Sequence, residues 1–304
     1  MTNWNDFAHA LRERCPSLEL RRNEPMAKHT SFRVGGPAAL MALPKSGEEA
    51  MAAVQTARAR GVTPFLMGNG TDLLVADEGY DGFLIKCFDG LDTLERKGNT
   101  IHAGSGVLLS RLANFAQENG LTGLEFAHGI PGTVGGAVTM NAGAYGGEMV
   151  QVLKHVTVLS EEGEKTTFPA SECDLSYRHS AFSDGKRLIL SAEVDLQPDD
   201  PAAIRGRMDE LMAKRKAKQP LEYPSGGSTF KRPQGHFAAA LIEQCGLKGA
   251  SVGGARVSEK HAGFVINTGG ATCGDILSLI ARVRRVVQEQ TGVKLELEVQ
   301  VLGV

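Results

Sequence analysis

Apolar side chains recur at helical spacing in several parts of the chain, and this pattern predicts amphipathic helices. In residues 3–14, the side chains of Trp4, Phe7 and Leu11 fall on one face, and a Cys-Pro pair ends the run. The same kind of pattern predicts a helix over residues 108–119. Ser46 as N-cap predicts one over 46–60, a strongly charged run predicts one over 202–218, and further helices are expected over 237–245 and 272–289.

Short runs bounded by turn residues, most of them apolar and the one at 29–37 polar, predict strands between these helices. They cover residues 29–37, 40–43, 63–67, 73–75, 82–87, 91–96, 100–103, 152–160, 165–169, 188–196, 262–266 and 294–301. The last run alternates, so that Glu296 and Glu298 share one face and Leu295 and Leu297 share the other. On spacing alone, a solvated edge explains these carboxylates better than catalysis does.

The chain has 304 residues, which predicts two or three domains. Residues 197–201 (Gln-Pro-Asp-Asp-Pro) form the best candidate linker, because Pro and Asp favour turns. We therefore expect one domain over residues 1–196 and a smaller one over residues 197–304.

Composition and charge exclude several classes of protein. The net charge of −2 argues against a general nucleic-acid or anionic-membrane surface, so an anionic substrate would need a local basic cluster. Five scattered cysteines have no C-x-x-C spacing, which predicts neither a disulfide framework nor a metal site. With no signal-peptide pattern and no apolar run of about 20 residues, we expect a cytoplasmic protein.

Two glycine-rich stretches carry the strongest chemical signal. Residues 125–148 contain seven glycines among small apolar side chains, which favours a backbone that approaches a flat or phosphorylated ligand over a bare loop. Residues 68–72 (Gly-Asn-Gly-Thr-Asp) follow a buried strand, as a phosphate-binding turn would. The third glycine of the Rossmann fingerprint is missing, so two glycine-lined walls around one dinucleotide are expected instead.

Basic residues cluster near further glycines in the second half of the chain. Ser228 follows two glycines, and Lys231 and Arg232 supply positive charge close by. This arrangement suits an anionic or phosphorylated substrate, although a hairpin with a basic tip would look the same. Arg178 lies in a Ser-Tyr-Arg-His-Ser run, where a surface arginine is the default interpretation.

Taken together, these motifs resemble the UDP-N-acetylenolpyruvoylglucosamine reductase (MurB) family, flavoenzymes of peptidoglycan precursor synthesis. The resemblance runs over nearly the whole chain and rests on the His-Thr-Ser-Phe run at 29–32, residues 68–72, 129–137, 141–145, 177–178, 227–231, 263–267 and 298–300. The middle motifs are shared in part with other flavoproteins of the vanillyl-alcohol-oxidase type. An inserted tyrosine loop, present in some family members, is absent here, so the chain resembles the shorter branch.

The resemblance implies an α+β fold. Its FAD-binding domain would have two halves of the vanillyl-alcohol-oxidase/PCMH type, starting near residue 31, and a smaller α/β substrate domain would follow, with its last strand returning to the active site. The implied cofactors are FAD and NADPH. Residues that the resemblance assigns to FAD, chiefly through backbone amides of 68–72 and 132–137, are Gly68, Asn69, Gly70, Thr71, Asp72, Gly129, Pro131, Gly132, Thr133, Val134, Gly135, Gly136, Ala137, Asn141, Ala142 and Gly143.

The resemblance also implies an NADP+-dependent FAD oxidoreductase. Hydride would pass from NADPH to FAD N5 and then to the vinyl carbon of a UDP-N-acetylglucosamine enolpyruvyl ether, giving UDP-N-acetylmuramate. Arg178 and Glu298 would stabilise the enolate-like state, and Ser228 would donate the proton. Candidates for substrate binding are Tyr145, Lys231, Arg232 and Arg256. Beyond a small nucleotide-sugar substrate we expect no nucleic-acid, membrane or metal partner, and a monomer.

Two alternatives remain open. An oxidase of the same flavin fold could hold its flavin covalently through His29 or His128. A nucleotide-sugar binding protein could keep the fold without the chemistry, but the joint presence of Arg178, Ser228 and Glu298 argues against it.

Overall fold

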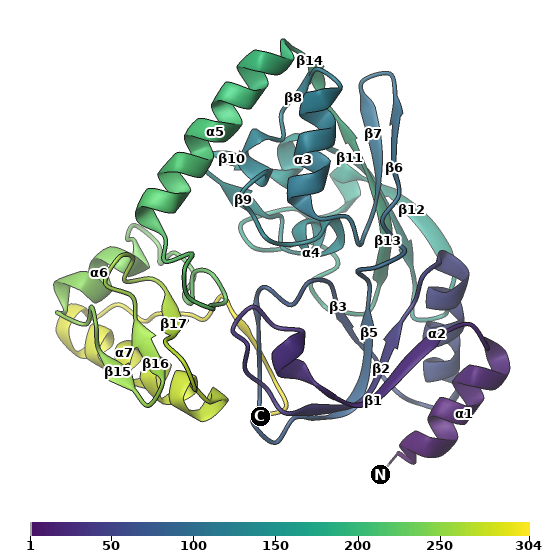
Figure 1. Cartoon of the computed structure of the whole chain (residues 1–304), viewed down its shortest axis with the longest axis horizontal. Coiled ribbons are helices and arrows are strands. Elements are labelled where there is room, and N and C mark those ends of the chain that lie inside the picture. The colour runs from purple at the N-terminus through teal and green to yellow at the C-terminus, as the bar shows by residue number, and fades with distance from the viewer. Residues whose placement is uncertain (1) are drawn as a thin grey trace. The chain divides into compact units, whose positions relative to one another are not determined.

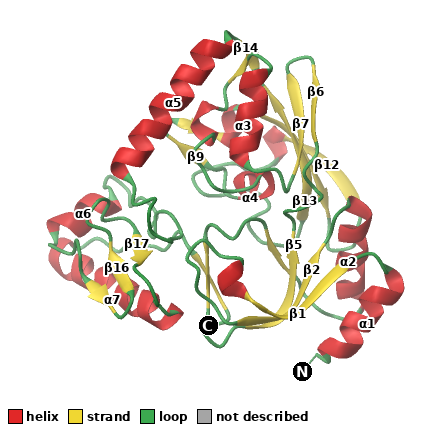
Figure 2. Ribbon diagram, viewed as in Figure 1, coloured by secondary structure: helices red, strands yellow, loops and turns green. Residues whose placement is uncertain are grey.

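The computed structural model describes residues 2–304 as a mixture of helices and strands (Figures 1 and 2). The helices are α1 (Trp4–Arg14), α2 (Gly47–Ala59), α3 (Leu109–Glu118), α4 (Val134–Thr139), α5 (Pro201–Lys218), α6 (Ala238–Gln244) and α7 (Cys273–Thr291). The strands are β1 (Glu19–Pro25), β2 (Pro37–Leu43), β3 (Phe65–Met67), β4 (Leu73–Val75), β5 (Tyr80–Lys86), β6 (Leu94–Lys97), β7 (Thr100–Gly104), β8 (Leu121–Thr122), β9 (Gly143–Ala144), β10 (Gly147–Glu148), β11 (Leu153–Leu159), β12 (Lys165–Pro169), β13 (Leu188–Asp195), β14 (Gln197–Pro198), β15 (Ser251–Val252), β16 (Ala255–Val257), β17 (Val265–Asn267) and β18 (Gln300–Leu302). This mixed content agrees with the predicted α+β class.

The chain divides into two compact units that interleave along the sequence. Unit 1 holds the chain up to Arg22, Leu40–Asn69 and Gly82–Lys214. Unit 2 holds Asn23–Ala39, Gly70–Asp81 and Arg215–Val304. Each unit has apolar clusters of its own.

Unit 1 contains two sheets with separate cores. The strand order β1-β2-β5-β3 forms one sheet, and α1 and α2 pack on it through a cluster that joins Phe7, Leu11 and Ala53 to Phe83 (Figure 1). The rings of Phe7 and Phe83 meet edge to face, with centroids 5.0 Å apart. Ser46 caps α2 by accepting a hydrogen bond from the Glu49 amide, as the sequence predicts.

The second sheet of unit 1 has the order β12-β11-β13-β7-β6 and is antiparallel throughout. Its core takes side chains from α3, α4 and the first half of α5. Helix α3 contributes the apolar stripe that the sequence predicted, including Leu112 and Ala116, and Met208 of α5 is fully buried there.

Unit 2 is built around α7, whose buried face includes Ile276, Leu279 and Val283. The three-stranded sheet β15-β16-β17 and helix α6 contribute to the same cluster. Strand β18 pairs in parallel with β4, from Gln300 opposite Leu73 to Leu302 opposite Val75. The last strand of the chain therefore pairs with a strand from its first third.

Several features differ from the sequence predictions. Residues 29–37 do not form a strand, because Arg33 has a φ of 56° and its amide closes a turn onto the Thr30 carbonyl. Of the predicted strand over 294–301, only the end belongs to a regular strand, β18. The polar strand β1 was not predicted at all.

The boundary between the units also lies later than residues 197–201. Residues 197–198 form β14, which pairs with β8 inside unit 1, and α5 then buries Ile204 and Met208 in the unit 1 core. The chain leaves unit 1 only after Lys214, because these contacts tie the predicted linker to the first unit.

Candidate active site

Within unit 1, the first glycine turn of the predicted FAD site lies close to the second glycine-rich segment. The Asn69 side-chain amide donates a hydrogen bond of 2.8 Å to the Pro131 carbonyl. A Cβ atom added to Gly68 would lie 2.3 Å from the Thr133 hydroxyl oxygen, so only glycine fits there. The structure thus brings residues 68–69 and 131–133 together, as the two-wall hypothesis requires.

Two buried hydroxyl groups in this region are unsatisfied. The side-chain oxygens of Thr133 and Ser105 have no hydrogen-bond partner within the described chain, although both residues are 1% exposed. A Cβ added to Gly135 would lie 3.0 Å from the Cβ of Ser105, which places Ser105 beside the glycine-rich segment. Buried polar groups without partners in the protein are rare in native structures, so these two hydroxyls are candidates for binding a ligand.

Ser105 was missed by sequence reasoning. It lies in a Gly-Ser-Gly run at residues 104–106, after β7 and before α3. A Cβ on either flanking glycine would lie 2.2 Å from a backbone oxygen. The run itself was the signal available in the sequence.

Part of the glycine-rich backbone is already engaged within the protein. The amides of Val134, Gly135 and Ala137 donate to the carbonyls of Val107, Ser105 and Thr133. The two orphan hydroxyls are therefore better suited to a phosphate than these three amides are.

The remaining residues of the first glycine turn belong to unit 2. The Gly70 carbonyl accepts a hydrogen bond of 3.0 Å from the Ser31 amide, and the Asp72 carbonyl accepts one of 2.9 Å from the Gln300 amide. The predicted turn is thus anchored in unit 1 at residues 68–69 and in unit 2 at residues 70–72.

Arg178 lies on a tight turn of unit 1. Ser176 and His179 exchange both backbone hydrogen bonds at 3.1 Å, so Tyr177 and Arg178 form the tip. Arg178 has a φ of 55°, an unusual backbone for a residue with a Cβ, and its guanidinium lies 5.1 Å from the centre of the Tyr177 ring. Tyr145, also at positive φ (55°), is 45% exposed.

Ser228 and Glu298 lie on neighbouring segments of unit 2. The Glu298 amide donates 2.9 Å to the Thr229 carbonyl, and the Lys231 amide donates 2.9 Å to the Glu296 carbonyl. The Thr229 amide in turn donates 2.8 Å to the Gly263 carbonyl. The segment that directly follows Ser228 is thus paired through its backbone with the segment that carries Glu298.

A basic pocket of about 360 Å³ lies beside these segments in unit 2. Lys231 and Arg232, both predicted to bind substrate, line it together with His236, Lys294 and Glu296. The Arg232 guanidinium lies 4.8 Å from the centre of the exposed Phe237 ring. His236 and Lys294 were not predicted, and Arg256 does not line this pocket.

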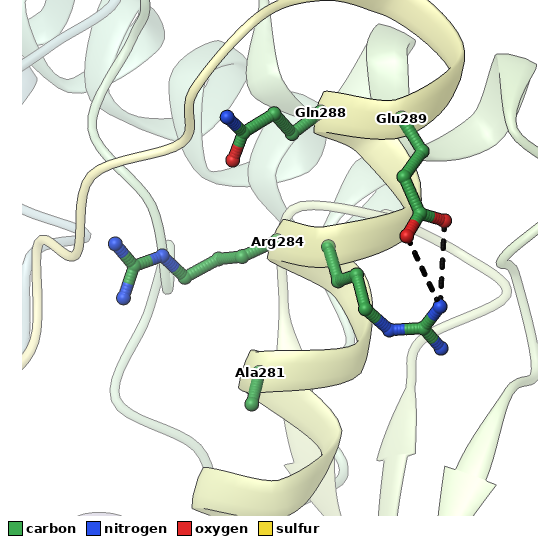
Figure 3. A pocket seen from close by; sticks show the side chains of 5 residues that line it. Ala281, Arg284, Gln288 and Glu289 are labelled. Carbon is green, nitrogen blue, oxygen red and sulfur yellow. Dashed lines mark hydrogen bonds and ion pairs between the residues drawn. The ribbon is translucent and has the colours of Figure 1, made fainter.

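A larger hollow of about 610 Å³ lies on α7 and contains none of the predicted residues (Figure 3). The Arg285 guanidinium donates to both carboxylate oxygens of Glu289 at 3.3 Å, and Arg284 donates to the Leu295 carbonyl at 3.1 Å. Its charges are those of an ordinary helix surface.

The two histidines considered for a covalent flavin have different surroundings. The His29 ring pairs with the Glu24 carboxylate at 2.8 Å, and the His29 side chain is only 7% exposed. Burial lowers the pKa of the half-buried His128 imidazole below its usual value, and Arg205 lowers it further. Within residues 2–304, no three His, Cys, Asp or Glu side chains are grouped so that they could hold a metal ion.

The fold and the glycine cradle define a flavoprotein with an FAD-binding domain. Residues 38–168 match the family model described as an FAD binding domain, and residues 219–302 match the C-terminal domain of UDP-N-acetylenolpyruvoylglucosamine reductase. These matches confirm the predicted two-domain fold class.

Whole-chain comparisons identify the family. The UDP-N-acetylenolpyruvoylglucosamine reductase of Clostridium tetani is 47% identical over 303 residues, covering 100% of this chain and 98% of the relative. That of Clostridium novyi is 50% identical over 285 residues, covering 94% and 92%. The chain belongs to the UDP-N-acetylenolpyruvoylglucosamine reductase family, whose cofactors are FAD and NADPH.

Comparison with solved structures agrees with this family assignment. The MurB reductase of Thermus caldophilus superposes with a TM-score of 0.81 at 36% identity, covering 94% of this chain and 98% of the other. A BBE-like protein of Physcomitrella patens, 14% identical with a TM-score of 0.51, covers 63% of this chain and 44% of its own, which shows a shared fold alone.

Proposed function

We propose that this protein reduces the enolpyruvyl ether of UDP-N-acetylglucosamine-enolpyruvate to UDP-N-acetylmuramate, with NADPH as the electron source. The observation that carries the proposal is the end-to-end match to reductases of that name, with both domain models in the expected order. The pair of unsatisfied hydroxyls at Ser105 and Thr133 supports FAD as the resident cofactor.

In this proposal, FAD is held chiefly by the unit 1 cradle. The Ser105 and Thr133 hydroxyls donate to phosphate oxygens, and Gly68 lets the backbone pass close to them. Residues 70–72 and the segment from Gly129 to Gly143 complete the binding surface. When bound, FAD would supply the hydride chemistry, which is transfer from NADPH to the terminal vinyl carbon of the substrate.

Three side chains act on the substrate itself. Arg178 and Glu298 flank its carboxylate, where charge develops as the hydride arrives. The Ser228 hydroxyl gives its proton to the carbon next to that carboxylate, which completes the lactyl ether. Tyr145, Lys231, Arg232 and Arg256 bind the rest of the nucleotide sugar.

The basic pocket supports a role for Lys231 and Arg232 at the diphosphate. Lys294 adds positive charge to the same pocket, against the single carboxylate of Glu296. Two phosphate groups would meet complementary charge there. Arg256, on β16 and outside this pocket, is assigned to the substrate only by the family resemblance.

No helix of the described chain is long and apolar enough to cross a membrane. We propose a cytoplasmic monomer. The five free cysteines suit a reducing compartment.

An anaerobic experiment tests the function in two halves. NADPH should bleach the yellow flavin, and addition of the enolpyruvyl sugar nucleotide should restore its colour without oxygen. Persistent bleaching would contradict the proposal. Colour that returns only with air, together with flavin that stays in an acid precipitate, would favour the covalent oxidase.

The same assay tests the proposed acid. We expect Ser228→Ala to bleach with NADPH at the wild-type rate but to regain colour about 10²–10⁴-fold more slowly, because general acid catalysis contributes on that scale. Equal loss in both halves would refute Ser228 as the proton donor.

A further inference from the structure

The turn that carries Arg178 adopts a backbone that needs external support. A residue with a Cβ at positive φ costs roughly 1–2 kcal/mol, and it persists only where surrounding contacts enforce it. Arg178 has a φ of 55°, and the backbone hydrogen bonds between Ser176 and His179 close the turn. Contacts from outside the turn also hold it, at Ser176 and at Ser180.

Asn141 supplies that support from the glycine-rich segment. Its side-chain amide donates 3.1 Å to the Ser176 carbonyl, at the base of the turn, and 3.2 Å to the Glu148 carboxylate. Its side-chain oxygen accepts 2.9 Å from the Val150 amide. Asn141 is 1% exposed, so these bonds are shielded from water.

The orientation of the Asn141 amide follows from its partners. Ser176 and Glu148 present only acceptors, and Val150 presents only a donor. A flipped amide would oppose like groups at all three positions. Both amide hydrogens are used within the protein, so this side chain has no donor left for a cofactor.

A second contact ties the far side of the loop to the same segment. The Ser180 hydroxyl donates 2.8 Å to the Thr139 carbonyl at the end of α4, and Ser180 is 1% exposed. Both ends of residues 176–180 are therefore fastened to residues 139–141, within the predicted cofactor-binding segment.

We propose that Asn141 is a positioning residue for Arg178. It fixes the turn so that the guanidinium meets the substrate carboxylate when charge develops there, and its contribution to FAD binding is limited to its backbone. This proposal rests on the proposed role of Arg178 in the second half-reaction. A shift of about 1 Å in such a group lowers rates by about 10²-fold.

Asn141→Gly tests the contribution of the side chain separately from that of the backbone. Asn141 itself has a φ of 41°, which glycine adopts without strain, so the variant removes the hydrogen bonds and keeps the chain path. Asn23→Gly is the matched control, because Asn23 is exposed and has a φ of 49°. The control should behave as wild type.

The anaerobic half-reactions give the main readout. We expect Asn141→Gly to keep its flavin and to bleach with NADPH at the wild-type rate. Its return of colour with the enolpyruvyl substrate should be slowed by about 10–100-fold, as expected for a misplaced catalytic group. A return at the wild-type rate, or equal slowing of both halves, would overturn the proposal.

A double-mutant cycle with Arg178→Ala links the two residues. If Asn141 acts through Arg178, the double variant should be no slower than Arg178→Ala alone. Additive losses would overturn the proposal. If Arg178→Ala alone leaves the second half-reaction intact, the proposed function of Arg178 fails instead, so the two failures are distinguishable.

A further variant covers the case in which Asn141→Gly loses flavin. Asn141→Asp keeps the hydrogen bond from Val150 but sets an acceptor against Ser176 and Glu148. The same half-reaction pattern in Asn141→Asp would support the proposal. Loss of flavin from both variants would show that the side chain serves the cofactor domain as a whole and would overturn it.

Discussion

The two units hold their proposed catalytic residues in different ways. In unit 1, the Arg178 turn depends on the buried side chain of Asn141 and on the hydroxyl of Ser180. In unit 2, the segment that follows Ser228 is paired through its backbone, with Thr229 bonded to both Gly263 and Glu298. Support from side chains is vulnerable to single substitutions, whereas support from the backbone is shared among several bonds.

The largest effect is expected from a change in the packing next to Ser228, which tests how firmly unit 2 holds this segment. A Cβ on Gly226 would lie 2.4 Å from the Phe32 ring and 3.0 Å from Val299, and both are buried. We expect Gly226→Ala to destabilise unit 2 by about 1–3 kcal/mol, as overpacking does. Urea denaturation of the flavin-loaded protein measures this loss.

Gly206→Ala is the control for that substitution. Gly206 lies inside α5 with nothing within 4 Å of an added Cβ, so the change should raise stability by about 1 kcal/mol. Equal effects of the two substitutions would show that the contact with Phe32 is not tight.

Ser31 provides a smaller test on the unit 2 side. Its hydroxyl lies 2.6 Å from the Ser225 carbonyl and 3.2 Å from the Thr71 carbonyl, so it links the Ser228 segment to the glycine turn. Ser31→Ala removes about 1 kcal/mol of hydrogen bonding, but the backbone pairing of Thr229 remains.

We therefore expect Ser31→Ala to slow the substrate half-reaction by less than Asn141→Gly does. Stopped-flow measurement of the colour return compares the two directly. If Ser31→Ala were the slower variant, the contrast between side-chain and backbone support would be wrong.

Alkylation of the cysteines is the mildest test of how tightly the two units are packed, because it leaves the fold intact. Burial raises the pKa of Cys87 to about 12 and, as the main cause, raises that of Cys173 and Cys273 to about 11. At pH 8 these thiols are almost entirely protonated and should resist alkylation. The half-exposed Cys15 and Cys245 should react first, as mass spectrometry of the labelled protein can establish.

Labelling of the three buried cysteines in the folded protein would show that one of the cores opens easily. Cys87 and Cys173 report on unit 1, and Cys273 reports on unit 2, so the pattern would also show which unit opens.

The sequence predicted those elements whose signal is local. Helices α1 and α3 were found because apolar residues repeat at helical spacing, and α2 was found because Ser46 is a recognisable N-cap. Strand β1 was missed because its residues, Glu-Leu-Arg-Arg-Asn-Glu-Pro, are mostly polar and do not alternate. The link from β14 to β8 could not be read locally, because pairing partners far apart in the sequence leave no periodic signal.

The same limit applies to the candidate site. Glycine spacing and the family resemblance indicated residues 68–72 and 129–143, but the role of Asn141 depends on Ser176, which no local pattern connects to it. Two residues that line the basic pocket, Lys231 and Arg232, were predicted because they lie beside a glycine turn. Lys294 comes from the other end of the domain and joins them only in three dimensions.

The pairing of β4 with β18 has a consequence for how the chain acquires its shape during synthesis. Strand β4 emerges from the ribosome early, yet its parallel neighbour spans Gln300–Leu302 and is made last. All segments of unit 1 have been synthesised once Lys214 is added, so unit 1 can fold first. Residues 23–39 and 70–81 belong to unit 2 and can pack fully only after residues 215–304 have been synthesised. Such long waits slow folding and leave strand edges open to chaperones, so vectorial synthesis would complete the half that carries Ser228 last.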